Sequence, residues 1–190
     1  MDLSWLPDNG GTGHMPPSED VINFWKSVKE KTNFKTLVEI GFNAGHSSSI
    51  MLTLFDDIKI KSYDIGQFDI TKKNGIIVKE KFGDRFDLKI TDSKHLTYGE
   101  INGSDLLFID GGHDYPIVDG DISLWEGSDV PYVVIDDLQN AGVIKARDKL
   151  HKKGNVKILH EGSYHAVLPY AKRNKGRSPI KVNIELLERL

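Results

Sequence analysis

The chain has 190 residues, of which 38% are hydrophobic and 28% are charged, with a formal net charge of −3. This composition predicts one soluble globular domain with a real core, and no apolar run reaches the roughly 18 residues that a membrane span needs. Cysteine is absent, which excludes disulfides and a cysteine nucleophile, and no secretory signal is expected, so the sequence is compatible with a cytoplasmic protein.

The predicted elements begin with a loop rich in glycine and proline over residues 7–17, after which Ser18 is the expected N-cap of a helix. Apolar residues then recur at helical spacing from Val21 to Val28. Strand-like apolar runs follow at residues 36–41, 58–64, 86–91, 105–110, 131–136, 155–160 and 165–170. Helical segments separate the first six of these runs, at residues 47–55, 69–82, 94–101, 116–126 and 141–153.

Strands that alternate with helices predict βαβ units and a mainly parallel sheet. The last two strand-like runs flank only residues 161–164, so we expect them to form an antiparallel hairpin. The predicted organisation is a single α/β domain over residues 1–190. It comprises an N-terminal loop and helix at 1–34, a core at 35–170 and a tail at 171–190.

A glycine-rich turn follows the first predicted strand, within the segment 37–48 that reads LVEIGFNAGHSS. A strand, a tight turn and a helix start present free backbone N–H groups and a positive helix end to a ligand. The acidic Glu39 before the turn predicts a ligand with a positive group. The glycine spacing does not match the dinucleotide fingerprint, and the lysine of a phosphate-binding loop is missing. The alternative is a plain strand-to-helix turn.

Aspartates stand at the ends of four successive predicted strands after the first. Ligands of open α/β sheets lie outside the carboxyl ends of the strands, so these residues are the ones to interpret. Asp64 comes 23 residues after Gly41, close to the spacing at which adenosine-binding α/β proteins place an acid on the ribose. Asp92 could accept a hydrogen bond from an exocyclic amine. The alternative is that these residues only cap helices and form turns.

Three carboxylates are predicted at two neighbouring strand ends, from Asp110, Asp136 and Asp137. Hard oxygen ligands of this kind suit Mg²⁺, Mn²⁺ or Ca²⁺ rather than zinc. Without a metal they would repel one another, and one would hold a proton. His113 could accept a proton from a substrate hydroxyl, because histidine titrates near neutral pH. The alternatives are carboxylates that merely end a strand, and a surface loop histidine.

Two segments resemble motifs of class I S-adenosylmethionine-dependent methyltransferases. Residues 39–47, Glu-x-Gly-x-x-x-Gly-x-Ser, resemble the first motif as it occurs in the catechol O-methyltransferase-like and macrocin O-methyltransferase-like branches. Residues 110–115, Asp-Gly-x-His-x-Tyr, resemble the fourth-strand motif of the macrocin-type group. The resemblance covers about residues 35–170. It implies a Rossmann-like fold with a seven-stranded, mainly parallel sheet and a C-terminal antiparallel hairpin.

The resemblance also implies roles for the residues of the cofactor site. Asp64 would bind the ribose of S-adenosylmethionine, and Asp92 and Ser93 would meet the adenine. Glu39 would face the ammonium group, directly or through water, and Ser47 the carboxylate. The residues expected to hold the methionine end are Glu39, Gly41, Phe42, Gly45 and Ser47. Asp110 is expected to belong to both the cofactor site and the metal site.

A divalent ion, Mg²⁺ or else Mn²⁺ or Ca²⁺, would be held by Asp110, Asp136 and Asp137. The last ligand is usually asparagine in catechol O-methyltransferase-like enzymes, so Asp137 is a departure that adds negative charge. His113 stands where these enzymes place a catalytic lysine or histidine, and it is the expected base. The implied activity is methylation of a hydroxyl on a small acceptor such as a sugar, a catechol or a polyketide-like glycoside.

Two other functions stay open at this point: a metal-dependent enzyme of the same fold with hydroxylase-like chemistry, and a non-catalytic protein that binds S-adenosylmethionine. Detection of S-adenosylhomocysteine as a product separates them from a methyltransferase.

The basic segment near the C-terminus and the loops near both ends of the chain allow predictions about binding partners. Residues 145–181 carry 11 Lys and Arg against 2 Asp and Glu, but no aromatic residues interleave with the charges from 172 to 181, so nucleic acid is not expected as a partner. The loops 7–17 and 171–181 are the expected substrate-facing segments. The apolar C-terminal residues are compatible with packing on the core or in a homo-oligomer.

Overall fold

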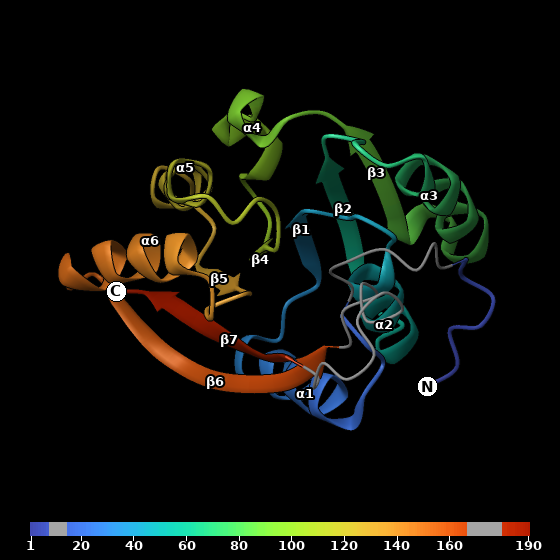
Figure 1. The fold of residues 1–190 in the computed structure, drawn as a ribbon, viewed down its shortest axis with the longest axis horizontal. Coiled ribbons are helices and arrows are strands. Elements are labelled where there is room, and N and C mark those ends of the chain that lie inside the picture. The colour runs from blue at the N-terminus through green and yellow to red at the C-terminus, as the bar shows by residue number, and fades with distance from the viewer. Residues whose placement is uncertain (8–14, 167–179) are drawn as a thin grey trace.

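Seven strands form one sheet in the computed structural model, which describes residues 1–7, 15–166 and 180–190 (Figure 1). The strands are β1 (Thr36–Ile40), β2 (Lys59–Asp64), β3 (Phe86–Ile90), β4 (Leu106–Ile109), β5 (Tyr132–Ile135), β6 (Val156–Ala166) and β7 (Ile180–Arg189). The helices of the described residues are α1 (Glu19–Thr32), α2 (His46–Leu54), α3 (Asp69–Phe82), α4 (Tyr98–Ile101), α5 (Tyr115–Glu126) and α6 (Ala141–Lys152), with short 3₁₀ helices η1 (Gly83–Arg85) and η2 (Ser93–His95).

The order of the strands across the sheet is β3-β2-β1-β4-β5-β7-β6. β3, β2, β1, β4 and β5 run parallel to one another, whereas β7 runs antiparallel to both β5 and β6. Helices connect the parallel strands, as the alternating pattern of the sequence predicted. The predicted fold, a mainly parallel seven-stranded sheet with an antiparallel hairpin at its C-terminal end, is confirmed.

The predicted position of that hairpin is wrong. Residues 161–164, expected to form its turn, continue β6. The seventh strand is β7, which the sequence pattern had assigned to a tail beyond the core, and it lies between β5 and β6. Val182 and Ile184 alternate along β7 and are buried, because this strand belongs to the interior of the sheet.

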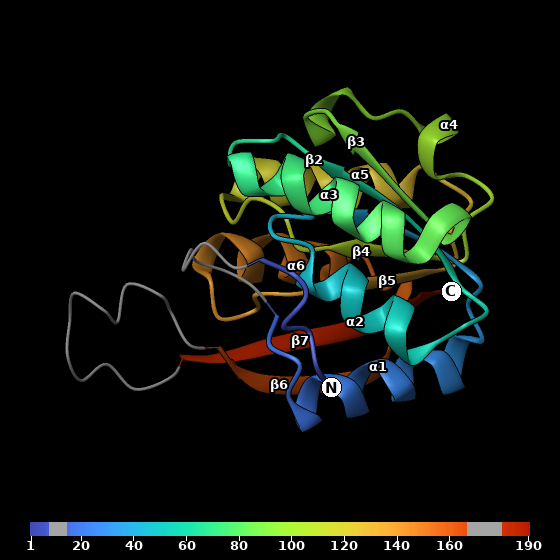
Figure 2. The ribbon, with the colours of Figure 1, turned by 90° about the vertical axis from the view of Figure 1, so that its right-hand side faces the viewer.

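Helices cover both faces of the sheet (Figure 2). The buried residues of α1, α2 and α3 form a core on one face, and those of α5 and α6 form a second core on the other. Successive residues of β4 alternate between the two cores, with Leu106 and Phe108 in the first and Leu107 and Ile109 in the second. Because both faces are covered, the central strands β4 and β5 read as unbroken apolar runs in the sequence.

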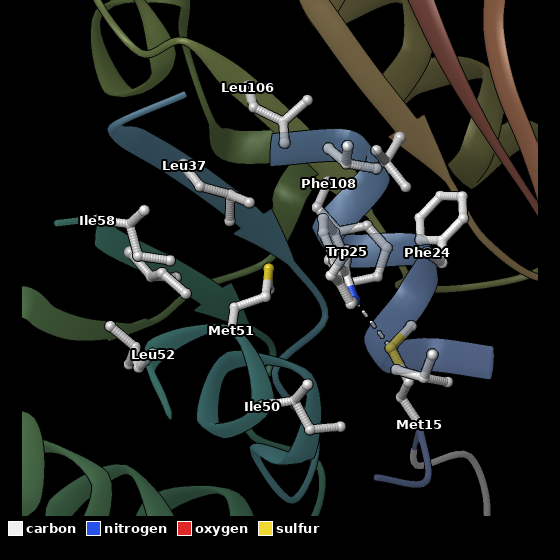
Figure 3. Close-up of a cluster of buried hydrophobic side chains, with 14 of the residues drawn as sticks. Met15, Phe24, Trp25, Leu37, Ile50, Met51, Leu52, Ile58, Leu106 and Phe108 are labelled. Atoms are coloured by element: carbon white, nitrogen blue, oxygen red, sulfur yellow. Dashed lines mark hydrogen bonds between the residues drawn. The ribbon is translucent and has the colours of Figure 1, made fainter. Parts of the chain in front are cut away.

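Trp25 is the largest fully buried side chain of the first core (Figure 3). It reaches the core because Ser18 caps α1 as predicted, accepting a hydrogen bond from the N–H of Val21, and sets the helix register. The indole ring packs edge-on against Phe108 of β4, and its Nε1–H donates to the Met15 sulfur at 3.2 Å. This packing fixes α1 against the centre of the sheet.

The parallel strands β1 to β5 all end at the same edge of the sheet. The segments that follow them there are 41–45, 64–66, 91–93, 110–113 and 136–137. The topology therefore gathers the polar residues that the sequence placed after separate strands. Within the described ranges, every helix is too short or too polar to cross a lipid bilayer.

Candidate active site

The turn between β1 and α2 is closed tightly by two glycines in the left-handed region. Gly41 has φ +101°, and a Cβ there would lie 2.1 Å from the backbone oxygen of Asp110. Gly45, the N-cap of α2, has φ +81°, and a Cβ there would lie 2.4 Å from the ring of Phe42. Phe42 is itself buried and packs against Phe86. Packing and backbone geometry thus explain both glycines before any ligand is considered.

Glu39 lies fully buried beneath this turn. Its carboxylate accepts hydrogen bonds from the hydroxyls of Ser47, Ser48 at 2.6 Å and Ser62 at 2.5 Å. Burial raises the pKa of the Glu39 carboxyl, while the three hydroxyls act in the opposite direction. Glu39 therefore joins β1 to the first turn of α2 and to β2, and the Ser47 hydroxyl points inward to it.

Asp64 ends β2 and faces the glycine turn. Its Oδ2 accepts from the backbone N–H of Asn43 at 2.8 Å, and its Oδ1 accepts from the N–H of Gly66 at 2.7 Å. These two bonds hold the carboxylate in one orientation. Each oxygen keeps a further lone pair, so Asp64 can still accept hydrogen bonds from a ligand hydroxyl.

A cleft of about 860 Å³ opens at this edge of the sheet. Within the described part of the chain, its lining includes Gly41 but not Glu39, Phe42, Gly45 or Ser47. Its apolar walls include Ile40, Tyr63, Ile65, Leu96, Tyr98, Ile117 and Leu124. Its polar lining includes Asp64, Thr91, Asp92, Ser93, Lys94, Thr97, Asp121 and Ser123. A mostly apolar cleft with a few polar groups is the usual form of a small-molecule site.

Asp92 and Ser93 both line the cleft, as predicted, but in different ways. Asp92 caps η2 and accepts from the backbone N–H of Lys94 at 3.1 Å. Its Oδ2 lies 2.7 Å from the Lys94 ammonium, which holds the pKa of the Asp92 carboxyl below its ordinary value. Ser93 instead lies near Asp121 on α5 and acts to lower the pKa of its carboxyl.

Asp121 was not predicted as a site residue. It lies on the inward face of α5, is 3% exposed and lines the cleft. Burial raises the pKa of its carboxyl to about 6. A signal for it was present, because Val118, Asp121, Ile122 and Trp125 occupy the i, i+3, i+4 and i+7 positions of one helix stripe. A charged residue in an apolar stripe rarely lacks a role.

Asp110 and Asp136 lie together at the ends of β4 and β5. The pKa of Asp110 is raised well above its ordinary value by burial and by the charges of Asp136 and Asp137. Burial also raises the pKa of Asp136 to about 7, although its Oδ2 accepts from the Tyr164 hydroxyl at 2.6 Å. The acidic groups predicted from separate strands are therefore neighbours, and one of them favours its protonated form, as expected. Tyr164 was missed because β6 was predicted to stop before it.

His113 pairs with Asp137, its Nε2 lying 2.6 Å from Oδ2. This hydrogen bond raises the pKa of the His113 imidazole, and the partial burial of the ring opposes the shift. Asp137 is held in the left-handed region with φ +59°, and Gln139 donates to its other oxygen. Among the described residues, the lining of the cleft includes Gly111 and Gly112 but not Asp110, His113, Asp136 or Asp137, so the pair lies beside the cleft and not in its wall.

The described residues do not fit a divalent ion as they stand. Both oxygens of Asp136 accept hydrogen bonds, from Tyr164 and from the N–H of Asp137, and both oxygens of Asp137 are engaged by His113 and Gln139. Among residues 1–7, 15–166 and 180–190, no three His, Asp or Glu side chains are grouped closely enough to hold a metal. Hard oxygen donors are present, but they are turned toward protein partners.

Most of the two segments expected to face the substrate, 7–17 and 171–181, falls outside the described residues, as does most of the basic run from 172 to 181. Their predicted roles remain predictions.

Comparison with known proteins gives a family match over the centre of the chain. The sequence profile described as a methyltransferase domain matches residues 38–137, which is more than half of the chain and includes both resembling motifs. No curated protein matches the sequence.

Solved structures with the same fold include several methyltransferases. An O-methyltransferase of Bacillus cereus, in complex with S-adenosylhomocysteine, is 13% identical over 98% of this chain and 86% of that chain, with a TM-score of 0.64. TomG of Streptomyces achromogenes, an O-methyltransferase of tomaymycin synthesis in complex with S-adenosylmethionine, is 14% identical over 90% and 80%, with a TM-score of 0.61. A Pyrococcus horikoshii protein described as an RNA methyltransferase is 15% identical over 89% and 80%, with a TM-score of 0.64. At such identities the likeness shows the fold alone.

Proposed function

The chain belongs to the methyltransferase-domain family, and from this premise we propose that it transfers the methyl group of S-adenosylmethionine to a hydroxyl oxygen of a small acceptor. The class of enzyme is an S-adenosylmethionine-dependent methyltransferase. The observation that carries the finer proposal is the cleft of about 860 Å³, which is lined by Gly41 and Asp64 and reaches Gly111 and Gly112, beside the His113–Asp137 pair.

The carboxyl groups at the strand ends near the cleft suit this cofactor. S-adenosylmethionine carries a sulfonium and an ammonium group, and Asp110 lies among the charges of Asp136, Asp137, Glu39 and Asp64. Positive groups placed beside these carboxylates would relieve their mutual repulsion and favour their ionised forms. The same field favours the sulfonium cofactor over its neutral thioether product.

The cofactor is proposed to span the cleft from the glycine turn to η2. Asp64 accepts hydrogen bonds from the ribose hydroxyls, since its orientation is already fixed by Asn43 and Gly66. The Gly41 turn and Asp110 meet the methionine end. Glu39, Phe42, Gly45 and Ser47 act as positioning residues, because they shape the turn from beneath rather than line the cleft.

The reaction is an in-line displacement. The acceptor oxygen attacks the methyl carbon, the carbon–sulfur bond breaks, its electron pair goes to sulfur, and the hydroxyl proton leaves to a base. Alignment of the two reactants supplies about 7–11 kcal/mol of such a barrier. A cleft that fixes the cofactor beside a positioned base is therefore the main requirement.

His113 is proposed as that base. Asp137 engages its Nε2, so the acceptor of the proton is Nδ1, and the carboxylate stabilises the imidazolium that forms. Because Asp137 raises the pKa of His113, the imidazole is neutral only at higher pH than a free histidine. The methylation rate should accordingly rise as the pH is increased through that raised pKa.

Metal assistance by Asp110, Asp136 and Asp137 stays a prediction, and no step of the mechanism above depends on it. Binding of Mg²⁺ there would have to use the remaining lone pairs of carboxylate oxygens that already accept from His113, Gln139 or Tyr164, or displace these donors. A methylation assay with and without EDTA tests it. Activity that is lost on addition of EDTA and restored by Mg²⁺ would support metal assistance. Activity that EDTA does not change would indicate that Asp136 and Asp137 only hydrogen-bond the protein groups described above.

The acceptor is proposed to be a small hydroxylated molecule. The fold does not decide this, because the solved structures of the same fold include one described as an RNA methyltransferase. We also propose that residues 1–190 form one domain, since a single sheet takes strands from residue 36 to residue 189. A homo-oligomer and a cytoplasmic location remain predictions.

Product analysis tests the proposal. The protein is incubated with S-adenosylmethionine and a panel of sugars, catechols and phenolic glycosides, and with a structured RNA as a control, and S-adenosylhomocysteine is measured. Formation of S-adenosylhomocysteine with a hydroxylated small molecule supports the proposal. Formation with RNA alone would assign the acceptor to nucleic acid, and binding of the cofactor without any product would favour the non-catalytic alternative.

A further inference from the structure

We propose that the outer edge of β3 and the exposed face of α3 form an interface with a second copy of this chain. The two copies are related by a two-fold axis perpendicular to the sheet, and their β3 strands pair antiparallel. This inference does not depend on the proposed function, because it concerns a surface away from the glycine turn.

β3 is the edge strand of the sheet, and in the described part of the chain it pairs with β2 alone (Figure 1). The N–H of Thr91, just after β3, donates to the backbone oxygen of Asp64 on β2 at 2.8 Å. Backbone groups alternate in direction along a strand, so the N–H and C=O groups of Leu88 and Ile90 point away from β2. An edge with such groups is a template for another strand.

The charges of β3 are self-complementary about Leu88. Asp87 and Lys89 flank this residue in the sequence, and both are exposed. An antiparallel pair with its two-fold axis at Leu88 places each Asp87 opposite Lys89 of the second copy, where side chains of facing strands come closest. A register shifted by one residue, with its axis at Lys89, would instead oppose two lysines.

The exposed face of α3 has the same symmetry. Lys72, Ile76 and Glu80 are spaced by four residues, so they follow one ridge of the helix, and all three are exposed. A two-fold axis at Ile76 places each Lys72 opposite Glu80 of the second copy and the two isoleucines against each other. Self-complementarity of this kind is what an isologous interface requires.

A single axis fits both elements, because Ile76 and Leu88 lie at the same level of the structure. A Cβ built at Gly75, the neighbour of Ile76, would lie 2.4 Å from Cδ2 of Leu88. Lys79, further along α3, donates to the backbone oxygen of Phe86, the first residue of β3, at 2.8 Å. The helix therefore runs opposite to the strand, and a two-fold axis at this level reverses both.

This face also has apolar surface and charges that the chain itself leaves open. Ile76 is 62% exposed and Ile90 is 40% exposed. They line a groove of about 400 Å³ together with Lys72, Glu80, Asp87 and Leu88. Within the described ranges, the ion pairs include none of Lys72, Glu80 and Asp87, and Lys89 reaches only Glu100, at 3.9 Å. A second copy supplies partners for each of these groups.

Sedimentation equilibrium of the full chain measures the association. Interfaces of small area are weak, so the protein concentration is varied from about 5 to about 500 µM, and the wild-type protein should show a monomer–dimer equilibrium. Ile76→Asp sets two like charges against each other at the axis and should raise the dissociation constant about 10-fold or more. Ile158→Asp changes an exposed isoleucine of β6, the opposite edge strand, and should keep the wild-type constant.

Exchange of charges tests the register of the two strands. Asp87→Lys and Lys89→Asp each oppose like charges in their own dimer, twice, and each should dimerise about 10-fold more weakly than the wild-type protein. An equimolar mixture of the two variants restores both pairs of opposite charge. It should form a heterodimer with a dissociation constant within about threefold of the wild-type value.

Glu30→Lys provides the matched charge control. It changes the net charge by as much as Asp87→Lys does, at an exposed residue of α1, the helix that contacts β6 at the opposite edge of the sheet. This variant should keep the wild-type dissociation constant. Circular dichroism verifies that each variant is folded.

Three results would overturn the inference. The first is a wild-type protein that stays monomeric over the whole range of concentration. The second is a dimer that Ile76→Asp leaves intact, or one that dissociates in Ile158→Asp and so lies at β6. The third is a mixture of Asp87→Lys and Lys89→Asp that associates no better than either variant alone, because the antiparallel pairing of β3 would then be absent.

Discussion

Two regions of this molecule bury carboxyl groups, and they treat them differently. Beneath the glycine turn, Glu39 is fully buried and both of its oxygens accept from seryl hydroxyls. In the wall of the cleft, Asp121 is buried to a similar degree, but one of its oxygens accepts from no described residue. A satisfied buried acid holds elements together, whereas an unsatisfied one lowers the stability of the fold.

The aspartates at the ends of β4 and β5 are intermediate between Glu39 and Asp121 in how fully their oxygens are hydrogen-bonded. Asp136 and Asp137 have protein donors, yet burial and mutual repulsion raise the pKa of Asp110 and of Asp136. Perturbed groups of this kind cluster at functional sites, because a protein that needed only stability would have placed apolar residues there.

Glu39→Ala should produce the largest change in stability, and it tests whether the fully hydrogen-bonded Glu39 holds the fold together. Three buried hydroxyls lose their acceptor, so unfolding free energy should fall by about 3–5 kcal/mol and the melting temperature by roughly 10 °C. Thermal denaturation measures this, with Glu39→Gln as the milder control that keeps one acceptor oxygen. A variant with an unchanged melting temperature and lost cofactor binding would show that Glu39 is a ligand contact instead.

His113→Ala should come next, with turnover lowered about 10²- to 10⁴-fold and cofactor affinity nearly unchanged, because the base acts on the acceptor proton. Steady-state kinetics on a responsive acceptor measures it, with the exposed His95 changed to alanine as the control. The wild-type rate should rise with pH through the raised pKa of His113, and this rise should disappear in the variant. Equal losses in turnover and in cofactor affinity would argue against a base.

Asp121→Asn should have a smaller effect and one of opposite sign, a gain in stability of the cofactor-free protein. The pKa of this carboxyl rises from 3.8 to about 6 on folding, so between these values the folded protein binds more protons than the unfolded chain. The contribution of the Asp121 carboxyl to the unfolding free energy is therefore most favourable below pH 3.8, and it decreases as the pH rises toward 6. Removing the charge should raise unfolding free energy by about 2 kcal/mol at pH 7.5 and flatten this dependence.

Urea denaturation at pH 5 and pH 7.5 measures the difference between Asp121→Asn and the wild-type protein. A variant that is less stable than the wild-type protein at pH 7.5 would place Asp121 with Glu39, as a residue that holds the fold together.

The sequence predicted the fold and the grouping of the acidic residues at the strand ends, because both follow from the order of strands and helices along the chain. Apolar runs that alternate with helices give a parallel sheet, and its topology brings Asp64, Asp110 and Asp136 to one edge wherever the boundaries fall. The end of the chain was mispredicted because β7 alternates Val182 and Ile184 just after a basic segment that reads as a loop. Pairing with β5 overrides that local signal, and pairing over such a distance is invisible in local sequence.

The site was predicted less fully, since a motif gives the position of a residue but not the direction of its side chain. The motif predicts that Glu39 and Ser47 contact the ligand, and only the structure shows that the Ser47 hydroxyl donates to Glu39 beneath the turn. Asp121 escaped notice because it stands inside a helix and not after a strand. Its place in the lining of the cleft depends on the strand ends and η2 that face it, and only the tertiary structure brings these together.

Calorimetric titration of S-adenosylmethionine into the wild-type protein and Asp64→Ala tests the central claim most directly. The account predicts one binding site on the wild-type protein and an affinity about 100-fold weaker in the variant, because two hydrogen bonds from ribose hydroxyls to a charged acceptor are lost. Wild-type affinity in the folded variant, or no binding to either protein, would contradict it.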